Sequence, residues 1–136
     1  MADTLIVKVV TPAQKLYDGE AGSIVAPGKQ GEFGILPGHD PWLVALGMGP
    51  LHIQNAKGES WAFFLNGGYC RIDDNHVEVL AETCESADKI DMERAAAAKG
   101  RAEERIKASA KDEDVDMMRA EAALRRALYR LEVAGK

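Results

Sequence analysis

The chain has 136 residues, of which 46% are hydrophobic, so it can form one ordinary domain or two small ones with a packed core. Its formal net charge of -5 argues against nucleic acid as a partner, and its hydrophobic fraction is too high for a chain that is disordered throughout. The first ten residues include an acidic side chain and no long apolar run. We therefore expect neither a signal peptide nor a membrane-spanning segment there.

The first part of the chain has the pattern of short β-strands separated by turns. The segment Leu5–Val10 is rich in β-branched residues and stops before Pro12. Two hairpins are indicated further on, the second around the turn residues Asp73, Asp74 and Asn75. The expected strands cover residues 5–10, 23–26, 51–54, 61–65, 69–72 and 76–80. Strands of this length and spacing predict an all-β antiparallel sandwich or barrel of about ten short strands.

After residue 86 the composition changes, because Gly and Pro nearly vanish while Ala, Glu, Arg and Lys dominate. This composition predicts two helices joined by a short polar break, which form an antiparallel hairpin. Asp88 or Asp91 can cap the first helix. Asp114 or Asp116 can cap the second. We therefore divide the chain into a β-domain, residues 1–86, and a helical hairpin, residues 87–136.

The second helix has one apolar face with many small side chains. Its members alternate in steps of three and four: Met117, Ala120, Leu124, Ala127, Leu131 and Ala134. Alanine lets a partner approach closely but buries little area, so two such helices are only marginally stable by themselves. We expect the hairpin to depend on docking to the β-domain, to a ligand or to another subunit.

The sequence offers no catalytic or metal-binding constellation. Cys70 and Cys84 do not form a C-x-x-C motif and are most simply reduced, structural thiols. The histidines lack metal-ligand spacing, and no Ser/His/Asp or G-x-S-x-G pattern occurs. We expect no enzyme activity of the chain's own, no metal and no required cofactor.

Several segments resemble the epsilon subunits of bacterial F-type rotary ATP synthases. The most specific is Gly31–Pro41, GEFGILPGHDP, which is similar to the family signature. The other matching segments are Val9–Pro12, Leu16–Tyr17, Asn66–Tyr69, Val77–Ala81, Ile90–Ala95 and Ala123–Leu131. Asn66 stands where the family usually has Ser. Together the segments extend over essentially the whole chain.

The resemblance implies a non-catalytic central-stalk subunit of a proton-translocating ATP synthase, held peripherally at the cytoplasmic face of the bacterial cell membrane. The implied partners are the gamma subunit and the membrane rotor ring of c subunits, between which the β-domain helps to transmit rotation. The hairpin is folded down in one state. In another it extends into the alpha/beta catalytic head and inhibits ATP hydrolysis.

The signature segment implies a contact with these partners. Its prolines and glycines stiffen and turn the backbone, and a tight connection between sheets is the simplest structural explanation. With the resemblance, Glu32 and His39 become candidates for contact with the rotor ring. Trp42 and Leu43 belong either to the core or to a patch that grips gamma.

The resemblance also implies ATP as a regulatory ligand of the folded hairpin, because some bacterial members bind it there. The residues at the matching positions are Glu85, Ile90, Asp91, Arg94, Arg101, Arg126 and Arg130. Arginine forks suit phosphate oxygens, whereas Asp91 would recognise the nucleotide rather than its phosphates. Without the resemblance, the same charges form ordinary solvated helix faces, and Asp91 is a helix cap. Two further alternatives are a free-standing ATP-binding sensor and a generic helical-hairpin scaffold.

Overall fold

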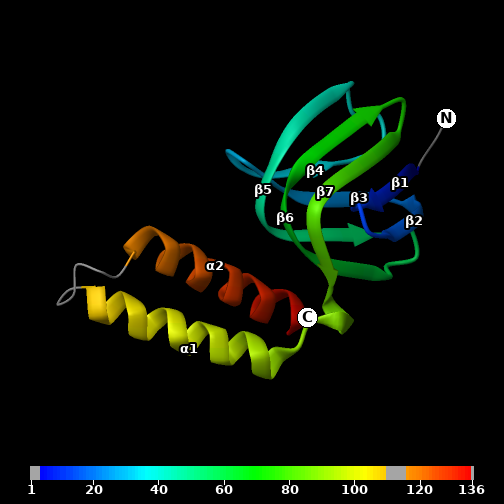
Figure 1. The fold of residues 1–136 in the computed structure, drawn as a ribbon. Helices are drawn as coiled ribbons and strands as arrows, with labels where there is room; N and C mark the ends of the chain where they lie inside the picture. The colour runs from blue at the N-terminus through cyan, green and yellow to red at the C-terminus, as the bar shows by residue number, and fades with distance from the viewer. Residues whose placement is uncertain (1–3, 110–115, 136) are drawn as a thin grey trace.

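The computed structural model describes residues 4–109 and 116–135, which form a β-domain followed by a hairpin of two helices (Figure 1). The elements are β1 (Leu5–Val10), β2 (Lys15–Ala21), β3 (Ser23–Gly28), β4 (Gly31–Ile35), β5 (Trp42–Gln54), β6 (Ser60–Asp73), β7 (His76–Ser86), the 3-10 helix η1 (Ala87–Lys89), α1 (Met92–Ser109) and α2 (Met117–Ala134). Within these residues, no helix is long and apolar enough to cross a membrane.

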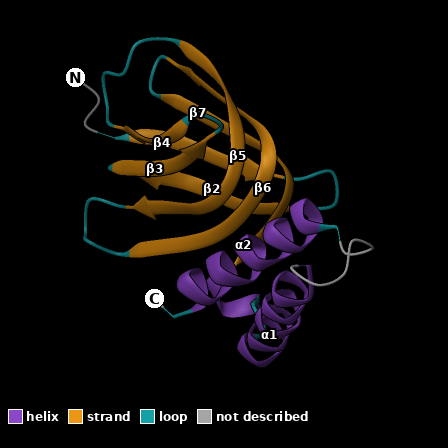
Figure 2. Ribbon diagram, turned by 90° about the vertical axis from the view of Figure 1, so that its left-hand side faces the viewer, coloured by secondary structure: helices purple, strands orange, loops and turns teal. Residues whose placement is uncertain are grey.

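The strands form one curled sheet in the order β2-β1-β7-β6-β5-β3-β4, and the predicted all-β sandwich is confirmed. Each of the seven strands contributes buried side chains to the main core cluster, so the core lies inside the curl (Figure 2). The expectation of a purely antiparallel sheet is wrong at one pair, because β1 and β7 are parallel. A parallel pair needs a long connection, and here the chain from β2 to β6 lies between the two strands.

The expected number of about ten short strands is also wrong, because the long strands bend without breaking. The segments 61–65 and 69–72, expected as separate strands, are both parts of β6. The bend falls at Gly67 and Gly68, whose φ angles are +75° and +120°. A Cβ on Gly68 would lie 2.0 Å from the carbonyl oxygen of Leu80, so no side chain fits there. Because glycine tolerates these angles, β6 bends there and runs through both layers of the sandwich.

Strands β2 and β4 were not expected from the sequence. The glycines and prolines of the signature predict a stiff loop at Gly31–Ile35, but this segment pairs along β3 as an edge strand. Only Ile35 of its five residues is buried, so the strand lacks the apolar alternation that signals a sheet. The connection that remains between β4 and β5 is residues 36–41, which we call the contact loop.

The predicted hairpin between β6 and β7 is confirmed, with Asp73 opposite His76. The two residues between them, Asp74 and Asn75, have positive φ angles of 49° and 60°. Such angles suit the two-residue turns that match the twist of hairpin strands, and Asp and Asn tolerate them better than most residues. The hairpin between β5 and β6, with Ile53 opposite Trp61, is confirmed as well.

Two of the proposed helix caps are present. The Asp91 carboxylate accepts a hydrogen bond from the Arg94 backbone N–H at 3.0 Å, and Asp116 accepts one from Arg119 at 3.1 Å. Asp88 lies in η1 instead, and Asp114 lies outside the described residues.

The helices pack against each other through small side chains, and α2 attaches them to the sheet. The buried residues of the seam are Ala95, Ala102, Ala120 and Ala127. Helix α2 lies between α1 and the sheet, where it contacts β5 and β6 (Figures 1 and 2). Its fully buried Val133 packs with Phe64 and Ile90 in a second, smaller cluster. Val133 lies outside the predicted apolar stripe, since it faces the sheet rather than α1.

Candidate functional site

A polar pocket of about 430 Å³ lies where the β-domain meets the hairpin. The end of β7, η1, the first half of α1 and one residue of α2 form its walls. Its lining residues are Glu85, Lys89, Ile90, Asp91, Arg94, Ala95, Ala98, Arg101 and Arg130. Six of the seven residues predicted for ATP binding are therefore brought together: Glu85, Ile90, Asp91, Arg94, Arg101 and Arg130.

Arg130 connects α2 to the sheet on one side of this pocket. Its Nε and Nη2 atoms lie 2.9 and 2.8 Å from Oε1 of Glu85, near the end of β7. The guanidinium carbon also lies 4.9 Å from the centre of the Phe64 ring. An arginine over an aromatic face is attracted by the ring quadrupole in addition to its carboxylate partner. The two contacts place the Arg130 guanidinium at the junction of the two domains.

The opposite wall carries cations that are not paired within the described residues. Arg94 and Arg101 stand seven positions apart on one face of α1, and both are exposed. Within the described ranges, neither they nor Lys89 lie within 4 Å of a carboxylate oxygen. The lining holds four cationic side chains against two carboxylates, Glu85 and Asp91, so the pocket favours a polyanion.

Arg126 and Lys89 differ from the sequence interpretation. Arg126, predicted to bind ATP, lies one turn before Arg130, is half-buried and does not line the pocket. Lys89 lines it but was not predicted. Its position directly before Ile90 and Asp91 was the available signal, although a single lysine carries little information.

A second feature is the contact loop at the far end of the sheet. The His39 ring stacks on Trp42 with centroids 5.9 Å apart, and Phe33 meets Trp42 edge to face at 5.2 Å. The backbone N–H of Gly38 donates a hydrogen bond of 2.7 Å to Oδ1 of Asn75. The loop is therefore held both by aromatic packing and by the turn between β6 and β7.

Two apolar side chains at the start of β5 are exposed rather than buried. Trp42 is 44% and Leu43 is 65% exposed, so the core alternative is wrong for both. Glu32 is exposed on the edge strand β4, where it pairs with Pro27. His39 and Trp42 thus lie together, whereas Glu32 belongs to a neighbouring element.

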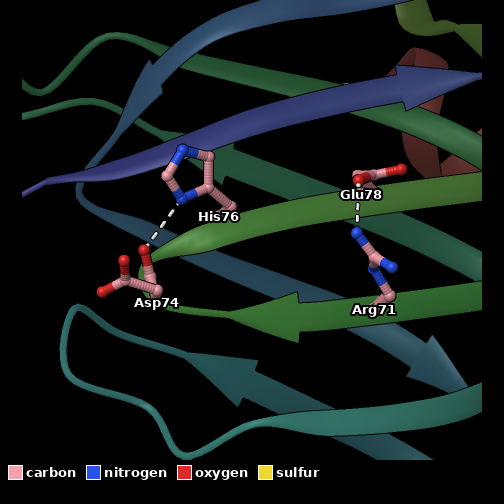
Figure 3. A network of polar contacts seen from close by, with 4 residues as sticks. All are labelled: Arg71, Asp74, His76 and Glu78. Carbon is pink, nitrogen blue, oxygen red and sulfur yellow. Dashed lines mark hydrogen bonds and ion pairs between the residues drawn. The ribbon is translucent and has the colours of Figure 1, made fainter.

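The outer face of the sheet combines one ion pair with exposed apolar side chains. Figure 3 shows Arg71 on β6 and Glu78 on β7, whose side chains approach to 3.1 Å, and the His76 ring beside the Asp74 carbonyl at 2.8 Å. Tyr69 and Leu80 are exposed next to them and line an apolar depression of about 410 Å³. An apolar hollow beside charged groups is a typical protein contact surface.

The two cysteines match the structural interpretation. Cys70 and Cys84 are buried and do not form a disulfide. Burial raises the pKa of each thiol to about 12, with the Glu85 charge adding to the effect at Cys84. Such thiols stay protonated at neutral pH and are poor nucleophiles. Among the described residues, no cluster of His, Cys, Asp or Glu has the arrangement of a metal site.

Comparison with protein families first defines the class. Residues 4–87 match the family described as "ATP synthase, Delta/Epsilon chain, beta-sandwich domain". Residues 88–135 match "ATP synthase, Delta/Epsilon chain, long alpha-helix domain". The observed fold, a curled sheet followed by a helical hairpin, is thus that of delta- and epsilon-type chains of ATP synthases.

Individual relatives narrow this class. The chain is 44% identical to the ATP synthase epsilon chain of Desulforapulum autotrophicum, with 98% of this chain and 97% of that one covered. It is 48% identical to the epsilon chain of Geobacter sulfurreducens, with 100% and 97% covered. A chain in the mitochondrial ATP synthase of Euglena gracilis, a structure of OSCP, F1 and c-ring, superposes with a TM-score of 0.81 at 25% identity, with 100% and 84% covered. The chain belongs to the family of bacterial ATP synthase epsilon chains, which confirms the resemblance found in the sequence.

Proposed function

We propose that the chain is a non-catalytic regulatory subunit of the central stalk of a proton-translocating ATP synthase. In this role it couples the rotor ring to the catalytic head through gamma and lies peripherally at the cytoplasmic face of the bacterial cell membrane. Membership of the epsilon-chain family supports the proposal, as does the likeness to a chain of the Euglena gracilis assembly that contains F1 and a c-ring.

Two surfaces of the β-domain suit the two partners. The outer face around Tyr69 and Leu80 offers an apolar depression beside the Arg71–Glu78 pair, which suits the side of a helical subunit such as gamma. The contact loop, with exposed Leu36 and the stacked His39 and Trp42, is held more rigidly than an open loop, which suits a joint to the rotor ring. Glu32 supplies a negative charge nearby.

ATP is the ligand that best fits the polar pocket between the β-domain and the hairpin. The single observation that carries this proposal is the convergence of Arg94, Arg101 and Arg130 from two helices around about 430 Å³. Pockets for small ligands in proteins measure roughly 300–1,000 Å³. The arginines would bind phosphate oxygens through charge-assisted hydrogen bonds. One Asp91 oxygen accepts the capping hydrogen bond, which leaves the other to accept from a base amino group.

This arrangement links ATP to the state of the hairpin. The pocket exists only while α1 and α2 are folded against the sheet, since its walls come from all three. ATP therefore stabilises the folded hairpin and depopulates an extended one by mass action. In the extended state, the arginine-rich helices reach the alpha/beta head and inhibit ATP hydrolysis. ATP binding and inhibition are then mutually exclusive.

Calorimetric titration of the full chain with ATP tests the pocket. We expect saturable binding that is lost in an Arg94→Ala, Arg101→Ala double variant, because each lost phosphate contact removes about 1.5–3 kcal/mol. Arg105→Ala is the matched control, since Arg105 is exposed on the same helix and lies outside the pocket lining. An Arg126→Ala variant then decides whether that residue joins the site when ATP is bound.

Absence of binding at millimolar ATP would contradict the nucleotide part of the proposal but not the stalk role. The stalk role is tested by co-purification of the chain with gamma, comparing wild type with a Tyr69→Asp, Leu80→Asp variant. Binding of ATP without any association with gamma would instead favour the free-standing sensor.

A further inference from the structure

The contact loop is tied to a distant part of the chain by one side chain. Oδ1 of Asn75 accepts a hydrogen bond of 2.7 Å from the backbone N–H of Gly38, which lies 37 positions earlier. In the part of the chain that the structure describes, this is the one side-chain hydrogen bond between the loop and another element. Asn75 belongs to neither the signature segment nor the pocket.

The backbone of Asn75 is itself fixed from two sides. It is the second residue of the turn between β6 and β7, with a φ of 60°, and its carbonyl oxygen accepts a hydrogen bond of 2.8 Å from the N–H of Ile6 in β1. The same turn is shown in Figure 3 by Asp74 and His76. Since β1 and the turn hold its main chain, the short Asn75 side chain presents its oxygen from a rigid base.

The loop has few other restraints. Its backbone closes a local turn in which the His39 N–H donates to the Leu36 carbonyl at 3.2 Å. Gly38, between these two, has a φ of +89° and no side chain with which to pack. The aromatic stack holds the loop only from His39 onward. Exposed Leu36 and half-buried Pro37 therefore depend on the hydrogen bond at Gly38 for their position.

We propose that Asn75 is a positioning residue that fixes the contact loop in the conformation it presents to the rotor ring. This inference rests on the proposed function for the ring contact, and adds to it the residue that shapes the contact surface without being part of it. An alternative explanation of Asn75 is its tolerance of a positive φ alone. Glycine satisfies that requirement at least as well but has no amide oxygen.

Two variants separate these explanations. Asn75→Gly keeps the turn geometry and removes the acceptor, whereas Asn75→Asp keeps an acceptor oxygen at the same place. We expect Asn75→Gly to raise the hydrogen-exchange rate of the Gly38 amide about fivefold, the factor that corresponds to one ordinary hydrogen bond. Asn75→Asp should restore protection. An unchanged Gly38 exchange rate in Asn75→Gly would overturn the inference.

The functional measurement is the affinity of the full chain for detergent-solubilised rotor ring with gamma bound. We expect about fivefold weaker binding for Asn75→Gly, because the loop must be ordered on association, and near-normal binding for Asn75→Asp. Trp42→Ala reports separately on the loop contact. If Trp42→Ala weakens binding and Asn75→Gly does not, the inference is wrong and the proposed ring contact stands. If neither variant weakens binding, the loop contact fails and the inference fails with it.

Discussion

The β-domain and the hairpin are held together by different kinds of side chain. Among the residues that the structure describes, the largest fully buried side chains are Phe64 and leucines, isoleucines and valines of the sheet, whereas the seam between the helices buries four alanines. A buried leucine or isoleucine contributes roughly 1.5–3 kcal/mol, and one buried methyl group only about 0.8 kcal/mol. We therefore expect the sheet to fold by itself and the hairpin to depend on its contact with the sheet. The regulatory role proposed for the hairpin requires this difference.

The strongest test of this difference between sheet and hairpin is a substitution that creates a cavity in the core of the sheet. Leu65 is fully buried in the main core, so Leu65→Ala should lower the free energy of unfolding by about 3 kcal/mol. Leu128, on α2, is 43% exposed, and Leu128→Ala should change it by less than about 0.5 kcal/mol. Urea unfolding followed by circular dichroism measures both. Equal losses in the two variants would mean that the hairpin carries as much of the stability as the sheet.

The docking of α2 on the sheet is tested by placing a charge in its buried contact. Val133 is fully buried beside Phe64 and Ile90. Val133→Asp should weaken docking by roughly 2 kcal/mol, because an unpaired carboxylate loses its hydration there. We expect fast hydrogen exchange throughout α2, measured by mass spectrometry, and little change in exchange of the core strands.

Leu128→Asp is the control for that variant, since it adds the same charge to the exposed side of the same helix. Docking should survive it. If Val133→Asp also exposed the core of the sheet, the two domains would unfold as one unit and the hairpin could not detach alone.

Alkaline pH should destabilise the sheet through its two buried thiols. Cys70 and Cys84 have pKa values raised from 9.0 to about 12 in the folded chain. Between these values the unfolded chain loses protons that the folded chain keeps. The contribution of the protonated thiols to the free energy of unfolding is therefore fully present below pH 9 and is lost as pH rises toward 12. At pH 10 the loss is about 1 kcal/mol per thiol. A Cys70→Ala, Cys84→Ala variant should show a shallower decline in urea unfolding from pH 8 to pH 10. An identical decline would contradict the role of burial.

The sequence predicted the hairpin better than the sheet. Caps and composition are local signals, and the helices do begin after Asp91 and Asp116, two of the four candidate caps. The parallel pairing of β1 with β7 is a contact between distant segments, and no local pattern encodes it. The edge strand β4 was missed because glycine and a single buried residue give it no alternation.

The pocket also combines residues that a local pattern predicts with residues that depend on contacts between distant segments. The family resemblance supplied Asp91, which caps α1, and Arg94 and Arg101, which lie two turns apart on one face of that helix. Arg126 and Arg130 share one face of α2, so their position along the helix decides which of them reaches the pocket. Val133, three residues after Arg130, packs with Phe64 and Ile90 on the sheet, whereas Arg126 lies one turn further from this contact and does not line the pocket. A helical repeat alone does not contain this information.

The smallest expected effect belongs to the link between the regions, the Arg130–Glu85 ion pair. Both side chains are about one third exposed, at 35% and 37%, so solvent screens their attraction. A double-mutant cycle with Arg130→Ala and Glu85→Ala should give a coupling energy of about 0.5 kcal/mol for docking, which shrinks in 1 M salt. The contact of Arg130 with Phe64 lies outside this coupling and should persist in the Glu85→Ala background. The cycle is read from hydrogen exchange in α2. A coupling that is large and insensitive to salt would mean that the pair, rather than Val133, holds the hairpin down, and that a polyanion could release the hairpin by taking Arg130 away from Glu85.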